Sequence, residues 1–151
     1  MLFRIANPDD IRPIITLLHD DIIAQDREHI NQDQYTHYEQ AFLRIIGEKT
    51  TDIYVIEDTN GTLVGVAQLF ILPHISRMGA TRAQVESVRI SKHLRGQGIG
   101  AKFMLYLMDV ARANGCVLMQ LTTDNRRDDA HRFYKRLGFQ STHNGMKIKL
   151  A

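Results

Sequence analysis

Three glycines fall within five residues, at Gly96, Gly98 and Gly100, between an alternating segment and a long apolar one. Glycine accepts left-handed backbone conformations, so this stretch predicts a tight turn whose N–H groups converge. A helix that begins at the turn adds its unpaired first-turn N–H groups and the positive end of its dipole. Segment 95–101 is therefore a candidate binding turn for phosphate or pyrophosphate. A flexible turn that merely reverses the chain is the alternative interpretation.

The charge balance makes any anion site a local feature of the chain. Nineteen Lys and Arg stand against seventeen Asp and Glu, a net charge of only +2, which argues against a nucleic-acid partner. The single cysteine, Cys116, excludes a disulfide scaffold. No apolar run approaches the ~20 residues that a membrane span needs. We expect one cytoplasmic domain over residues 1–151, with no signal peptide and no membrane partner.

The order of apolar patterns predicts an α/β (α+β) protein with three layers. Asn7 and Pro8 predict the start of a helix, with an apolar stripe at Ile11, Ile14, Ile15, Leu18 and Ile22. Further helices are expected at 33–47, 99–113 and 128–137. Strands are expected at 2–6, 52–57, 63–72, 83–90, 116–121 and within 139–150, with a hairpin turn at Asn60-Gly61 and an exposed loop at 74–81.

The strand before the glycine turn alternates along its length. One face is expected to hold Ala83, Val85, Ser87 and Arg89, and the other Gln84, Glu86, Val88 and Ile90. Glu86 lies on this strand, nine residues before Arg95 at the start of the turn.

Two known phosphate loops fit the turn poorly. A Walker loop needs Ser or Thr after its lysine, whereas Phe103 follows Lys102 here. Gly96, Gly98 and Ala101 do match the dinucleotide fingerprint G-x-G-x-x-A. That fingerprint needs an acidic residue about 20 positions further on, and Leu118 stands there. A nicotinamide enzyme stays as a minor alternative.

A third type of loop fits better. Arg95-x-x-Gly98-x-Gly100 resembles the acetyl-CoA pyrophosphate loop, Q/R-x-x-G-x-G/A, of the GNAT superfamily of N-acyltransferases. Downstream, Ala130-x-x-Phe133-Tyr134-x-x-Leu137-Gly138-Phe139 resembles the later family signature A-x-x-[FL]-Y-x-x-x-G-F. The resemblance implies a mixed, mostly antiparallel sheet that is splayed into a V-shaped cleft, with helices on both faces.

The resemblance implies acetyl-CoA as cosubstrate and no metal. The main chain of Val88 and Ile90 would bind the pantetheine arm, and Arg89 and Arg95 would supply charge. The pyrophosphate would be held by N–H groups of the turn: Gly96, Gln97, Gly98, Ile99, Gly100 and Ala101. Many family members place an asparagine where this chain has Arg127, so Asn125, two residues earlier, is the candidate substitute.

The resemblance also implies an acid and a base for transfer of an acetyl group to a primary amine. Glu86 lies nine residues before Arg95, where several family members place a catalytic glutamate, and its apolar neighbours suit a general base. An ion pair with Arg89 or Arg95, or a carboxylate simply solvated at the cleft, is the alternative role. Tyr134 is the candidate acid that protonates the departing thiolate. It also counts as a cofactor contact, and simple aromatic packing is the alternative.

Other residues carry weaker hypotheses. Seven histidines lack metal-ligand spacing, and Cys116 is expected to be a core thiol. His74 and Arg77 lie in the loop that would border the acceptor cleft, and simple exposure to solvent is the alternative. A second function class is a non-catalytic CoA-sensing or partner-binding module on the same fold. The resemblance also implies that a homodimer can form. The amine acceptor, a small molecule or a peptide, has no signature in the sequence.

Overall fold

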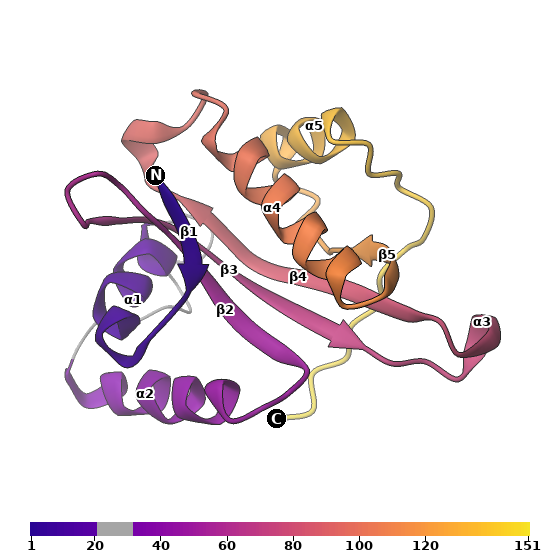
Figure 1. The fold of residues 1–151 in the computed structure, drawn as a ribbon, viewed down its shortest axis with the longest axis horizontal. Helices are drawn as coiled ribbons and strands as arrows, with labels where there is room; N and C mark the ends of the chain where they lie inside the picture. Colours follow the sequence, from indigo (N-terminus) through magenta and orange to yellow (C-terminus); the bar gives the residue numbers. More distant parts are fainter. Residues whose placement is uncertain (21–31) are drawn as a thin grey trace.

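The computed structural model describes residues 1–20 and 32–151. Five strands form one open sheet in the order β1-β2-β3-β4-β5 (Figure 1). The three pairings from β1 to β4 are antiparallel, whereas β4 and β5 are parallel. A dinucleotide-binding sheet is mostly parallel and doubly wound, so this sheet is not of that type. The strands are β1 (Leu2–Ile5), β2 (Thr51–Glu57), β3 (Leu63–Leu72), β4 (Thr81–Ile90) and β5 (Cys116–Gln120).

Helices cover both faces of this sheet. In Figure 1, α1 and α2 lie on one side and α4 and α5 on the other, so the predicted fold class is confirmed. The helices are α1 (Ile11–His19), α2 (Gln32–Ile46), α3 (Ser76–Gly79), α4 (Ile99–Ala113) and α5 (Asp128–Arg136), with 3₁₀ turns at Pro8–Asp10 and Lys92–Leu94.

Alternation along the strands divides the core into two layers. On β2, Ile53 and Val55 pack with α1 and α2, whereas Tyr54 and Ile56 belong to the layer that contains α4. The predicted stripe of α1 is buried at Ile11, Ile14 and Ile15, while Ile22 lies outside the described residues.

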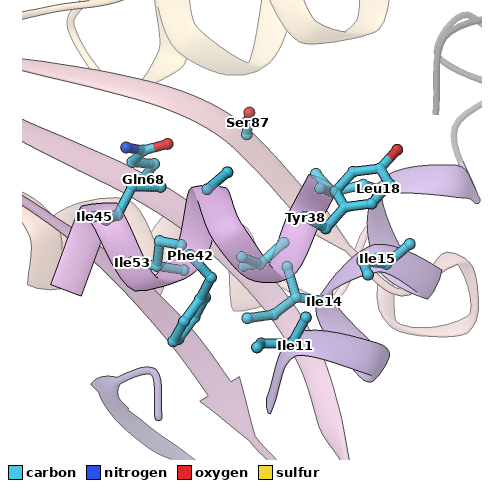
Figure 2. Close-up of a pocket in the computed structure, with 12 residues that line it drawn as sticks. Ile11, Ile14, Ile15, Leu18, Tyr38, Phe42, Ile45, Ile53, Gln68 and Ser87 are labelled. Atoms are coloured by element: carbon cyan, nitrogen blue, oxygen red, sulfur yellow. The ribbon is translucent and has the colours of Figure 1, made fainter. Parts of the chain in front are cut away.

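A small cavity of about 120 Å³ remains between α1, α2 and the sheet. Figure 2 shows that its walls are mainly apolar side chains of the two helices, such as Ile14 and Phe42. Gln68 of β3 and Ser87 of β4 line its polar side.

The N-terminal strand is fixed to its surroundings by Arg4. Its guanidinium lies 2.7 Å from Oδ2 of Asp10 and 2.8 Å from Oε2 of Glu57. Asn7 caps the following turn as predicted: its side chain accepts from the Asp9 N–H, and its own N–H donates to Asp10. The capping box therefore joins β1 to α1 through Asp10.

The end of the chain differs from the prediction. Residues 139–150 form no strand, although Met146, Ile148 and Leu150 alternate with two lysines. These three side chains are 95%, 84% and 91% exposed. A strand pattern forms a ladder only where a neighbouring strand offers its N–H and C=O groups, and this segment has no such neighbour among the described residues.

The expected loop at 74–81 contains the short helix α3, in which Arg77 and Met78 have left-handed φ values of 55° and 59°.

In the part of the chain that the structure describes, no helix has both the length and the apolar character of a membrane span.

Candidate active site

A β-bulge at Ser87 shapes the end of β4. Ser87 has a φ of 55°, and two residues of β4 stand opposite one residue of β3, because Glu86 pairs with Gln68 while Arg89 pairs with Val66. The alternation therefore resumes out of phase after Ser87. The prediction that Val88 and Ile90 share a face with Glu86 is wrong, since both pack into the layer that contains α4.

The ladder between β4 and β5 is short. It begins at Thr81 and ends at the pair Gln84–Gln120, so the rest of β4 up to Ile90 extends beyond its pairing with β5. Arginine side chains contact the main chain of this free stretch. Nη1 of Arg89 donates to the Val88 carbonyl at 2.9 Å. The segment expected to bind a pantetheine arm thus lies where the β4–β5 ladder has stopped.

The glycine turn follows directly after β4. Gly96 and Gly98 both have a φ of 78°, and Gly98 is the N-cap of α4. A Cβ at either glycine would meet no atom within 4 Å, so the turn is open to solvent on this side. The first N–H groups of α4 have no partner within the helix. These features fit a bound diphosphate, as the sequence predicts for the turn.

Tyr134 lies on α5, within electrostatic reach of Arg89 at the end of β4. Its ring packs edge-on against Phe133 and Phe139, with centroids 5.1 and 5.6 Å away. Burial raises the pKa of the Tyr134 phenol, while the positive charges of Arg89 and Arg127 act in the opposite direction and the negative charge of Glu86 reinforces the rise. Tyr134, Glu86 and the two arginines therefore lie within electrostatic reach of one another.

Glu86 is half-buried and lies on the face of β4 opposite Val85. Its Oε1 accepts a hydrogen bond of 2.7 Å from Nε2 of Gln84. Gln84 in turn accepts one of 2.8 Å from Gln120 of β5. The expected apolar surroundings of Glu86 are thus replaced by amides on its own face, which sequence reasoning missed. The one available signal was that Gln84 precedes Glu86 by two residues.

The loop between β5 and α5 carries the candidate Asn125 and leads into Arg127, which stands at the position of the family asparagine. Arg127 is half-buried at the start of α5, and its charge acts on Tyr134. Asn125 is exposed on the loop. The structure therefore brings Arg127 toward the phenol.

Within residues 1–20 and 32–151, no three His, Cys, Asp or Glu side chains form a group that could hold a metal. Burial raises the pKa of the Cys116 thiol, which disfavours the reactive thiolate.

Comparisons with known proteins identify the family. The model of the acetyltransferase (GNAT) family matches residues 16–139. The chain is 28% identical to the aminoalkylphosphonate N-acetyltransferase of Salmonella typhimurium over 145 residues, which cover 89% of this chain and 91% of that protein. It is 30% identical to the glucosamine 6-phosphate N-acetyltransferase of Trypanosoma brucei brucei over 90 residues, which cover 60% and 59% of the two chains.

The fold of this chain is also found among solved structures. A crystal structure described as a transcriptional regulator from Bacillus halodurans C-125 superposes with a TM-score of 0.94, at 34% identity and over 99% of both chains. The match to the family model spans most of the described sheet and its helices, including the glycine turn and Tyr134. This chain therefore belongs to the GNAT family of acetyltransferases.

Proposed function

We propose that this chain is a single-domain N-acetyltransferase, which transfers the acetyl group of acetyl-CoA to a primary amine by direct attack in a ternary complex. The observation that carries the proposal is that Glu86 and Tyr134 interact electrostatically where β4 runs beyond its ladder with β5, while Phe133, next to Tyr134, packs on Gly100 of the glycine turn. Acetyl-CoA supplies an electrophilic thioester carbonyl and a thiol leaving group.

The chain's own groups account for cosubstrate binding. N–H groups from Gly96 to Ala101 hold the diphosphate, and Arg95 adds a positive charge beside it. The main chain of Val88 and Ile90 holds the pantetheine arm in the manner of an added strand. Arg89 lies between these two residues and adds a second cation.

Two proton transfers complete the reaction. Glu86 takes a proton from the amine as the new C–N bond forms, directly or through one water molecule. Tyr134 gives its phenolic proton to the sulfur as the C–S bond breaks. A phenol has an ordinary pKa of about 10 and therefore carries its proton at neutral pH, so Tyr134 is available as an acid when the thiolate is held against it.

The acceptor that we propose is a small primary amine that carries a phosphonate or phosphate group. Two of the relatives are named for amines of this kind, an aminoalkylphosphonate and glucosamine 6-phosphate. The positive charges of Arg89 and Arg127 both act on Tyr134, so an anionic group bound near the phenol would be attracted by two cations.

The test measures release of free thiol from acetyl-CoA in the presence of aminomethylphosphonate, glucosamine 6-phosphate and a wider panel of amines. We expect turnover with at least one acceptor, and losses of kcat/KM of about 100-fold in Glu86→Gln and in Tyr134→Phe. Full turnover in both variants across the pH range would remove the assigned roles of these residues.

A second candidate function is a non-catalytic CoA-sensing or partner-binding module on the same fold. The Bacillus halodurans structure, at 34% identity, is described as a transcriptional regulator. Acetyl-CoA binding by calorimetry, without thiol release for any amine in the panel, is the result that favours this candidate.

A homodimer is also part of the proposal. Met146, Ile148 and Leu150 expose three large apolar side chains in an alternating row, which is the pattern of a strand that needs a partner. Sedimentation equilibrium tests this point: we expect a dimer for the unaltered chain and a monomer for Ile148→Lys. A monomer in both cases contradicts the dimer.

A further inference from the structure

A continuous row of hydrogen bonds ends on Glu86. Arg82 Nη2 lies 3.1 Å from Nδ1 of His74, and its Nη1 donates to Oε1 of Gln120 at 3.3 Å. Gln120 Nε2 donates to Gln84 at 2.8 Å, and Gln84 Nε2 donates to Glu86 Oε1 at 2.7 Å. The row crosses from β4 to β5 and back, and the bonds shorten from Arg82 toward Glu86.

The chemistry of these groups gives the row one direction. A guanidinium only donates hydrogen bonds, and an ionised carboxylate only accepts them. Gln120 uses its oxygen for Arg82, so its NH₂ group faces Gln84. Gln84 uses its oxygen for Gln120, so its NH₂ group faces Glu86. Both amides are therefore oriented by a permanent cation at one end and the carboxylate at the other.

The row of hydrogen bonds ends where β4 runs on beyond its pairing with β5. Gln84 and Gln120 form the last pair of the β4–β5 ladder, and Glu86 lies two residues beyond it on the same face. A carboxylate on a flexible side chain would offer either oxygen to a substrate. Here the amide of Gln84 donates to Oε1, which favours Oε2 as the oxygen offered to an incoming amine.

We infer that Gln84, held in place by Gln120, is a positioning residue that orients Glu86 for proton abstraction by Oε2. The inference rests on the proposed function, because it needs Glu86 to be the base. Gln84 itself touches neither substrate nor cosubstrate in this account.

The test uses Gln84→Met, which keeps the length of the side chain and removes its hydrogen bonds. With acetyl-CoA and the best acceptor of the amine panel, we expect kcat to fall about 10-fold while KM for acetyl-CoA stays within about 2-fold. In a Glu86→Gln background, the same substitution is expected to change kcat by less than about 2-fold, because its effect acts through the carboxylate.

Gln68→Met is the matched control. Gln68 is the cross-strand neighbour of Glu86, but its amide donates to Thr51 at 3.0 Å. We expect this variant to keep kcat within about 2-fold. Gln120→Met supplies a second variant if Gln84→Met fails to fold, and about a 3-fold loss with the same dependence on Glu86 is expected.

A spectroscopic readout needs no acceptor. In the ¹H–¹⁵N spectrum of the unaltered chain, the Gln84 side-chain amide proton bonded to the carboxylate is expected downfield of its position in Glu86→Gln. Equal losses from Gln84→Met in both backgrounds, or no loss where Glu86→Gln loses about 100-fold, would overturn the positioning role. Unchanged turnover in Glu86→Gln alone would overturn the assigned base as well, so the two failures are distinguishable.

Discussion

The Arg95 side chain is hydrogen-bonded to the strand it follows: its Nε donates to the carbonyl oxygen of Ile90 at 3.0 Å. This bond fixes the start of the glycine turn to the end of β4, where the pantetheine arm and the diphosphate would meet. Arg95→Met keeps the side-chain stem but loses the bond and the charge. We expect Kd for CoA to rise about 10-fold, as measured by calorimetry.

Arg44→Met is the control for that change, because Arg44 is an exposed arginine of α2. Its affinity for CoA is expected to equal that of the unaltered chain. Equal affinity in Arg95→Met would show that Arg95 has no part in binding.

Valine substitutions at Gly98 and Gly61 separate the effect of backbone strain on stability from the effect on cosubstrate binding. Both have a left-handed φ, 78° and 80°, with no atom within 4 Å of an added Cβ. Valine at either position is expected to cost about 1–2 kcal/mol of unfolding free energy, measured by urea denaturation. Only Gly98→Val is expected to abolish CoA binding, since Gly61 lies in the β2–β3 hairpin. Binding that survives in Gly98→Val would contradict the diphosphate site.

Ser87 has a left-handed backbone without being a glycine. Ser87→Gly removes the conformational penalty at the bulge, whereas Ser87→Val increases it through a branched Cβ. We expect the unfolding free energy of Ser87→Gly to exceed that of Ser87→Val by about 1–2 kcal/mol. Equal values in urea titrations would mean that the bulge relaxes without cost.

Tyr54 links stability to alkaline pH. Burial, aided by Asp52 and Tyr106, raises the pKa of Tyr54 to about 12. An unfolded phenol ionises near pH 10, so this contribution to stability is complete below about pH 10 and is lost as the pH rises through the folded value. Thermal unfolding between about pH 9.5 and 11.5 is expected to show a smaller fall in Tm for Tyr54→Phe than for the unaltered chain. Parallel curves would contradict this assignment.

Asp10 links stability to acid. Its burial works against ionisation, but hydrogen bonds from Arg4 and from the Asn7 N–H outweigh it and lower the pKa of Asp10. The resulting stability is present above the unfolded pKa near 3.9 and is lost as the pH falls through the lower folded value. We expect Asp10→Asn to lose about 2 kcal/mol at pH 7 and to respond less to acid.

The neighbouring Asp9 is the control for that prediction. It is exposed, and Asp9→Asn is expected to change stability by about 0.5 kcal/mol or less. Urea titrations at several pH values measure both variants. A loss for Asp9→Asn as large as that for Asp10→Asn would assign the effect to the helix dipole.

Local signals were sufficient for most element boundaries. Helix α4 runs over the predicted residues because Gly98 and Gly115, both with left-handed φ, bound it. Strand β3 likewise has its predicted limits between the Asn60-Gly61 turn and Pro73. Of that turn, only Gly61 has a positive φ.

Features that depend on neighbouring strands could not be predicted from the sequence. The bulge at Ser87 has no local signature, since its cause is the register against β3. The bond between Gln84 and Gln120 joins residues 36 positions apart, and only the β4–β5 pairing brings them together. In the tail beyond Phe139, the sequence pattern predicts a strand that does not form, because the tail has no partner strand in the described part of the chain.

The ring of Phe133 rests on the first turn of α4, where a Cβ at Gly100 would lie 3.4 Å from its Cζ. Alanine at position 100 would therefore make an ordinary van der Waals contact, whereas a longer side chain would press on Phe133 and shift α5. Tyr134 follows Phe133 directly in α5, so such a shift would also move its phenol. Under the proposed function, the fit of the diphosphate and the protonation of the leaving thiolate would then change together.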